Sequence, residues 1–168
     1  FLGWYTDADF KNQITEIKNS TGNITLYAKW KENYTNLTFT QSGSTYSVTD
    51  CATDIAIVII PDTYNGLPVT SIGDSAFEDC TSLTSITIGN SVTSIGYHAF
   101  YNCPIENATI PTIAISYVRN SKLKTVVING GTSIGEDAFY NCTSLTSVTI
   151  PNSVTSIEDR AFYGCTGL

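Results

Sequence analysis

One long phrase occurs twice in this chain, and the duplication constrains the fold more than any other feature. Residues 132–157 read TSIGEDAFYNCTSLTSVTIPNSVTSI, and residues 70–95 read TSIGDSAFEDCTSLTSITIGNSVTSI. An Ile, an Ala-Phe pair and a Cys recur along the chain with spacings of 23, 39 and 23 residues. The isoleucines of this series are Ile72, Ile95, Ile134 and Ile157. Self-similarity at such a period predicts an array of stacked structural repeats.

Each repeat contains one short phrase with the pattern Leu-x-x-Ile-x-Ile or a close variant. The phrases are Ile55-x-x-Val58-x-Ile60, Leu83-x-x-Ile86-x-Ile88, Ile105-x-x-Ala108-x-Ile110, Leu123-x-x-Val126-x-Ile128 and Leu145-x-x-Val148-x-Ile150. Residues 161–168 begin a further unit. This rhythm is that of leucine-rich repeats, in which each coil contributes one strand. Because a single coil cannot bury its own apolar face, we expect the strands to stack side by side into a continuous core, with ladders of Ile, Phe and Cys.

The segments between the strands are predicted from their glycines and acids. Gly73, Gly96 and Gly135 suggest backbone freedom at the turn that follows each return segment. Acids just before Ala-Phe, such as Asp74 and Glu136, favour the start of a short helical turn. The 39-residue gap is interpreted as two shortened units, and its segment AISYVRNSKLK (114–124) lacks both Ala-Phe and Cys. We therefore predict a distorted, irregular coil over residues 103–131, whose surface is specific to this protein.

The repeated consensus VTSIGxxAFxxCTSLTSVTIPxS strongly resembles the BspA-like leucine-rich repeat family. The opening segment VIIPDTYNGLPVTSIGDSAF (58–77) resembles the first coil of that family, and the likeness spans about residues 37–168. The resemblance implies an α/β solenoid, a right-handed superhelix with short parallel strands and short helical turns. On this basis the repeats are assigned to residues 55–168.

Two further segments precede the repeats. Residues 37–54 contain two alternating runs around the turn QSGS, and are predicted to form a β-hairpin that caps the first coil. Residues 32–36, ENYTN, are interpreted as a polar linker.

Residues 1–31 hold six aromatic side chains. The alternation in NITLYAKW predicts a strand, and the turn at Thr6–Asp9 is expected to lead into a short helical stretch. FLGWYTDADF and ITLYAKW resemble the back half of the Listeria–Bacteroides repeat, also called the internalin B-repeat, which implies a partial β-grasp-like module.

The chain shows no set of residues typical of a catalytic or metal site. Four of its five cysteines recur once per repeat instead of in CxxC pairs, so we interpret them as buried thiols. Cys51 lies outside the pattern, and is either another buried thiol or a partner in a disulfide. The single histidine, His98, is expected at an exposed helical position, without a nucleophile or an orienting acid. Asp7 and Asp9 alone supply too few oxygen ligands for an EF-hand-type calcium loop. We expect no enzyme, no cofactor and no metal.

Charge and hydropathy exclude further classes of partner. The formal net charge is −7. All of it arises in residues 34–168, where four basic residues face eleven acids. Because a nucleic-acid-binding protein needs a basic surface, and this chain is acidic, we do not predict binding to nucleic acid. The longest apolar run, 55–60, is strand-length, so no membrane insertion is expected in this fragment.

The chain has no Met and is interpreted as a piece of a longer protein. The one basic cluster, Arg119, Lys122 and Lys124, is either a solvated turn or a binding site on the irregular coil.

The residues that alternate with the buried ones form the main candidate binding surface. They are Ile57, Ile59, Ser85, Thr87, Asn107, Thr109, Thr125, Val127, Ser147 and Thr149, with the residues from Ser85 onward taken as the binding set. Stacked, they would make a neutral, hydroxyl-rich strip with apolar ends. The Ser and Thr side chains of the strip are either there only because strands tolerate them well, or they form a concave recognition face. It contains no aromatic side chain, which disfavours a glycan as the ligand.

Both resemblances imply a binding or adhesion module of a secreted, cell-surface bacterial protein, located outside the cell. The implied partner is a host or neighbouring-cell protein, recognised through the solenoid surface, or an extracellular-matrix ligand, with a glycan as the alternative. A passive spacer that projects another domain is the competing hypothesis. Six Asn-x-Ser/Thr sequons leave a eukaryotic secretory origin open.

Overall fold

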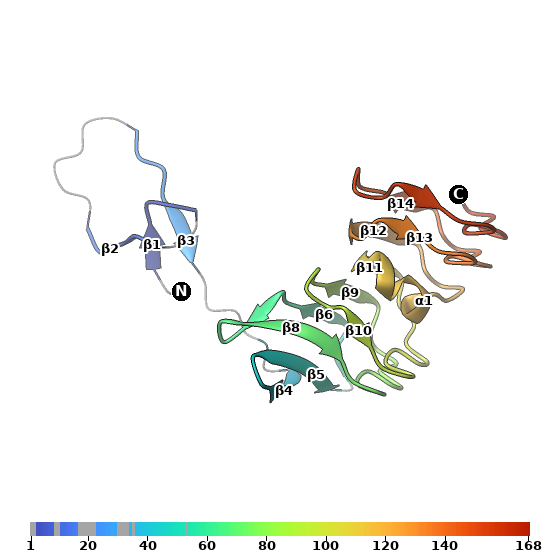
Figure 1. Cartoon of the computed structure of the whole chain (residues 1–168), viewed down its shortest axis with the longest axis horizontal. Coiled ribbons are helices and arrows are strands. Elements are labelled where there is room, and N and C mark those ends of the chain that lie inside the picture. The colour runs from blue at the N-terminus through green and yellow to red at the C-terminus, as the bar shows by residue number, and fades with distance from the viewer. Residues whose placement is uncertain (1–2, 9–10, 17–22, 30–33, 35, 53) are drawn as a thin grey trace. The chain divides into compact units, whose positions relative to one another are not determined.

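The fold was examined in a computed structural model that describes residues 3–8, 11–16, 23–29, 34, 36–52 and 54–168 (Figure 1). The chain divides into two compact units, Phe1–Tyr34 and Thr35–Leu168. Each unit is described by itself. The predicted linker 32–36 lies largely outside the described residues, which include only Tyr34 and Asn36 of it.

In the first unit, β1 (Gly3–Tyr5) lies between β2 (Gln13–Ile14) and β3 (Tyr27–Lys29), and both neighbours are antiparallel to it. The strand predicted in NITLYAKW is confirmed at β3. The helical stretch expected after the turn at Thr6–Asp9 is wrong where the structure describes it, because β2 is extended and pairs with β1.

A side chain of the first unit explains this turn back toward β1. The carboxylate of Asp7 accepts the backbone N–H groups of Lys11 at 2.9 Å and Asn12 at 2.7 Å. These bonds, chiefly the one from Lys11, lower the pKa of Asp7. Asp9 and the residues 17–22 and 30–33 lie outside the described residues.

The described part of the second unit contains a five-stranded parallel sheet that we call the front sheet. Its strands run in chain order: β6 (Ile57–Ile60), β9 (Ser85–Ile88), β11 (Asn107–Pro111), β12 (Thr125–Gly130) and β14 (Ser147–Thr149). Each strand coincides with one of the five predicted phrases, so these predictions are confirmed. One strand per repeat in chain order is the arrangement of a solenoid-like α/β fold.

The core lies behind the front sheet and repeats the same chemistry in each coil. Within the first four strands, the residues of the predicted inward set are buried, as in Val58, Ile86 and Val126, and their neighbours face outward. In the last strand, β14, the inward residue Val148 is half-buried. Phe77 stacks on Phe100 with ring centroids 4.9 Å apart, and Phe139 on Phe162 at 5.1 Å. Stacking lets each coil bury apolar area that it could not bury alone.

The return side of the coils is interrupted in the middle of the unit (Figure 1). β8 (Leu67–Ile72) pairs in parallel with β10 (Ser94–Ile95), and β13 (Ser133–Ile134) pairs in parallel with β15 (Ser156–Ile157). Between these two sheets the chain forms the 3-10 helix η1 (Thr112–Ala114) and the single-turn helix α1 (Ile115–Val118). The distorted coil predicted for residues 103–131 is thus confirmed, since η1 and α1 replace the return strand there.

The predicted β-hairpin is present and extends the return side of the unit. β4 (Leu37–Ser42) and β5 (Thr45–Cys51) are antiparallel, and β5 pairs in parallel with β8. Phe39 of the hairpin stacks on Tyr64 at 3.9 Å. Tyr64 belongs to β7 (Thr63–Tyr64), which is antiparallel to β8. The hairpin therefore covers an edge of β8, while β6 is the first strand of the front sheet.

The Ala-Phe segments form chained turns, so the expectation of short helical turns there is wrong. Two positions in these segments have left-handed backbone with φ between 52° and 58°. They are occupied by Ser75, His98, Asp137 and Arg160, and by Asp79, Asn102 and Asn141. A left-handed residue cannot continue a right-handed helix. The turns instead stack on the next coil through backbone hydrogen bonds, and the Asp74 carboxylate accepts the N–H of Tyr97 at 2.8 Å.

Candidate functional site

The predicted strip residues form two straight rows across the exposed face of the front sheet. The first row is Ile57, Ser85, Asn107, Thr125 and Ser147, and the second is Ile59, Thr87, Thr109, Val127 and Thr149. Neighbours within a row are paired in register, so their side chains are about 4.8 Å apart along the stack. We call these ten side chains the strip.

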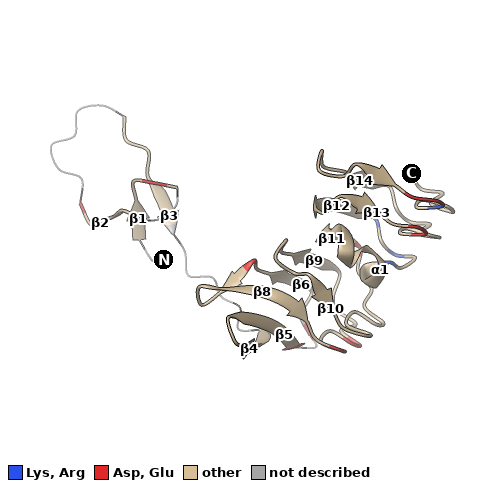
Figure 2. Cartoon of the chain, in the orientation of Figure 1, with Lys and Arg blue, Asp and Glu red and all other residues tan. Residues whose placement is uncertain are grey.

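The strip is solvent-accessible and uncharged. None of its members is buried, and Ile57 and Ile59 are 64% and 55% exposed. In Figure 2 the strands of the front sheet are tan, whereas charged residues gather in the turns of the repeats. Thr125 Oγ1 donates to Asn107 Oδ1 at 2.7 Å, which leaves the other hydroxyls of the strip without a side-chain partner in the described residues. Such a surface offers hydroxyl donors and acceptors beside an apolar end at β6.

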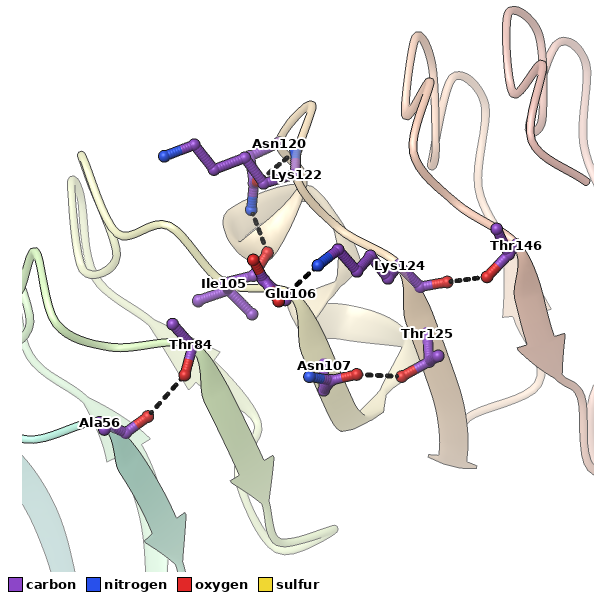
Figure 3. Close-up of polar contacts among 10 residues, drawn as sticks. All are labelled: Ala56, Thr84, Ile105, Glu106, Asn107, Asn120, Lys122, Lys124, Thr125 and Thr146. Carbon is purple, nitrogen blue, oxygen red and sulfur yellow. Dashed lines mark hydrogen bonds and ion pairs between the residues drawn. The ribbon is translucent and has the colours of Figure 1, made fainter.

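A further row at the start of the strands holds the coils together (Figure 3). Thr84 Oγ1 donates to the Ala56 carbonyl at 3.4 Å, and Thr146 Oγ1 to the Lys124 carbonyl at 3.1 Å. On the return side, Thr93 and Thr155 make the same kind of bond to the preceding coil. These threonines therefore have structural partners. The sequence repeat alone did not distinguish them from the threonines of the strip.

The structure separates the predicted basic cluster into three environments. Lys124 lies beside the strip, where its Nζ is 2.8 Å from Glu106 Oε2 (Figure 3). Arg119 donates a hydrogen bond from Nη1 to the carbonyl of Asp137 in the next coil. Lys122 lines a cavity of about 330 Å³ formed by residues 100–104 and 117–122, and forms no ion pair with the described residues.

His98 occupies a left-handed turn position, not the helical one predicted. Its ring stacks between Tyr97 at 3.8 Å and Tyr101 at 4.6 Å, and Nδ1 is 3.7 Å from Glu78 Oε1. Within the ranges that the structure describes, no three His, Cys, Asp or Glu side chains are placed to share a metal ion.

The repeated cysteines contribute hydrogen bonds as well as volume. Cys103 Sγ lies 2.8 Å from the Phe77 carbonyl, and Cys165 Sγ lies 3.0 Å from the Phe139 carbonyl, each in the preceding coil. Cys80, Cys103 and Cys142 are buried as predicted, and Cys165 is half-buried. Burial raises the pKa of Cys103 to about 12 and that of Cys142 to about 11. The Cys103 and Cys142 thiols are therefore un-ionised at neutral pH.

Cys51 of the hairpin meets the first cysteine of the series, because its Sγ is 2.9 Å from Cys80 Sγ. Burial also raises the pKa of Cys51. We predict that glutathione disulfide at about pH 8.5 slowly joins this pair. Two thiols would lose two electrons and two protons, which reduce one glutathione disulfide to two thiols.

Peptide mapping under non-reducing conditions measures this linkage. The expected product is a Cys51–Cys80 crosslink, with Cys103 and Cys142 unmodified in the folded protein. The Cys51→Ser variant is the control and should give no crosslink. Formation of glutathione adducts alone at Cys51 would contradict the prediction.

A family model describes most of the chain. Six copies of the BspA type leucine rich repeat region match residues 50–168. The chain belongs to the BspA-type leucine-rich repeat family. The Listeria–Bacteroides repeat domain matches residues 1–29 of this BspA-type chain. Both resemblances drawn from the sequence are thereby confirmed.

Solved structures of bacterial leucine-rich repeat proteins resemble this BspA-type chain. A leucine rich repeat protein from T. pallidum is 26% identical, with a TM-score of 0.56 over 83% of this chain and 69% of that one. A leucine rich cell surface protein from Faecalibacterium prausnitzii A2-165 is 29% identical, with a TM-score of 0.47 over 82% of this chain and 47% of that one. No curated protein matches the sequence. Across the described residues, the chain has no helix with the length and hydropathy needed to span a membrane.

Proposed function

We propose that this BspA-type chain is a non-catalytic binding module of a bacterial surface protein, and that the strip contacts a protein ligand. The observation that carries the proposal is the pair of in-register rows, which places ten uncharged, accessible side chains on one face of the front sheet. A right-handed solenoid would give this face the concave curvature that such proteins use for recognition.

The chemistry of the strip suits a protein partner. Interfaces combine an apolar region with hydrogen-bonding groups around it, and their centres are depleted of charge. Ile57 and Ile59 supply the apolar region, and the hydroxyls of the central strands supply the hydrogen bonds. The two matched families are linked to surface display and attachment, which supports a location outside the cell and a matrix protein as ligand.

Lysine substitutions in the strip test the proposal. Replacing Thr87, Thr109 and Thr149 by Lys introduces three charges along the second row of the strip, where they would have to be desolvated on binding. We expect at least about a tenfold loss of attachment of microspheres coated with the chain to an immobilised laminin–collagen matrix.

A matched control keeps the same chemistry away from the strip. Thr81, Thr132 and Thr143 are exposed and lie outside the front sheet, so their triple Lys variant should bind like the unmodified chain. Circular dichroism verifies that both variants are folded. Equal binding by the two triple variants would overturn the strip as the binding face, and absence of binding by the unmodified chain would favour a spacer.

A further inference from the structure

The Ala-Phe turns of neighbouring coils are joined by a regular backbone ladder. In the first pair of turns, three N–H groups donate to carbonyls of the next coil at 2.8–3.0 Å: Ser75 to Tyr97, Phe77 to Ala99 and Asp79 to Tyr101. In the last pair the bonds are 2.7–3.1 Å long: Asp137 to Asp159, Phe139 to Ala161 and Asn141 to Tyr163. An Ala-Phe turn that is followed by another Ala-Phe turn in the next coil thus donates backbone hydrogen bonds from alternate residues.

The second turn has the same donors but no such neighbour. The equivalent N–H groups belong to His98, Phe100 and Asn102. The next coil carries η1 and α1 instead of an Ala-Phe turn, and within the described part of the chain these three N–H groups have no hydrogen-bond acceptor. An unpaired row of backbone donors is a template for another chain.

A groove lies along this open row. One cavity of about 400 Å³ is lined by residues 97–101 with Ser116 and Tyr117, and the cavity of about 330 Å³ adjoins it. The two share Phe100, Tyr101 and Tyr117, so we treat them as one site and call it the turn-gap groove. Its volume is within the range of ligand sites.

The groove has aromatic walls and a basic end. Tyr97, Tyr101 and Tyr117 are 73%, 56% and 38% exposed, and tyrosine is enriched at binding interfaces. The lining segments 97–104 and 116–122 contain two basic residues and no acid, although the chain carries a net charge of −7. Arg119 is engaged by the Asp137 carbonyl, which leaves Lys122 as the cation available to a ligand. Figure 3 shows the side chain of Lys122 extending away from the Glu106–Lys124 pair.

We propose that the turn-gap groove binds an acidic peptide segment of a partner protein, which takes the place of the missing turn. Backbone carbonyls at alternate residues of the peptide accept from the N–H groups of His98, Phe100 and Asn102. A carboxylate of the peptide pairs with Lys122, and the tyrosines contact its apolar side chains. The alternating donors favour a peptide over a glycan, because alternate carbonyls are a property of polypeptide backbone. This site is separate from the strip, and does not depend on the function proposed for it.

A labelled peptide tests the site directly. The probe is a fluorescein-labelled peptide that alternates Asp and Val, and its control has Lys in place of Asp. We expect only the acidic peptide to bind. In ¹⁵N-labelled protein, binding should slow the hydrogen exchange of the His98, Phe100 and Asn102 amides by at least about tenfold, because these amides become hydrogen-bonded.

Paired variants separate the groove from general electrostatics. Lys122→Gln is expected to weaken the acidic peptide about fivefold to tenfold, and Lys124→Gln, which removes the same charge beside the strip, should leave its affinity unchanged. The proposal is overturned if the Lys peptide binds equally well or if both variants lose affinity equally. It is also overturned if no peptide binds at about 1 mM, or if a hyaluronan hexasaccharide protects the three amides and the peptide does not.

Discussion

Replacing Phe139 by alanine is expected to lower the free energy of unfolding by about 3–5 kcal/mol. The side chain is fully buried and stacks on Phe162 of the next coil, so its loss removes apolar contacts within one coil and between two. A loss of this size is a large fraction of the stability of an ordinary domain. Urea unfolding followed by far-UV circular dichroism measures it.

The matched control for this prediction is Phe162→Ala. Phe162 has the same position in the last described turn, but it is only half-buried because none of the described residues forms a further turn over it. Its replacement should therefore cost less than that of Phe139. Equal losses for the two variants, or a loss below about 1 kcal/mol for Phe139→Ala, would show that stacking between coils does not dominate the core.

The second large effect is expected at Gly96, where alanine should destabilise the solenoid by more than about 2 kcal/mol. A Cβ at this position would lie 2.4 Å from the Asp74 backbone nitrogen and 2.5 Å from the Gly73 carbonyl carbon. Backbone atoms cannot move aside without breaking the turn ladder between the two coils. Thermal and urea unfolding of the variant measure the loss.

Gly135 provides a control at the equivalent position. It follows the irregular coil, and a Cβ built on it has no atom within 4 Å. Neither glycine is left-handed, so backbone strain does not distinguish them. We expect Gly135→Ala to change the free energy of unfolding by less than about 1 kcal/mol. A similar large loss at both positions would contradict the missing turn on which the turn-gap groove depends.

The two glycines also show where the prediction from sequence was incomplete. Gly73, Gly96 and Gly135 were expected to provide backbone freedom, but the left-handed residues are His98 and its equivalents two positions later. Glycine is required at Gly96 because the preceding coil approaches it closely. Such a close approach joins residues that are 22–23 positions apart in the sequence. The conformational preferences of neighbouring residues cannot predict it.

The turns differ from the prediction for a related reason. Acids before Ala-Phe favour a helix start when only neighbouring residues are considered. In the structure, Asp74 accepts the N–H of Tyr97 in the next coil, and backbone bonds between turns select the left-handed conformations. Hydrogen bonding between coils therefore outweighs the local helical preference.

The sequence by itself determined the parallel front sheet, its five strands and most of the side chains that face its core, because burial in a stacked array imposes a fixed period and a strict alternation. Only the tertiary structure decided which polar groups remain available. Thr84 and Thr87 belong to the same repeated phrase, yet Thr84 is bonded to the preceding coil and Thr87 faces solvent. Likewise, the N–H groups of His98, Phe100 and Asn102 have no hydrogen-bond acceptor among the described residues, because the next coil forms a helix. The partner of each such group lies in another coil, so its availability depends on how the coils stack and where the stack is interrupted.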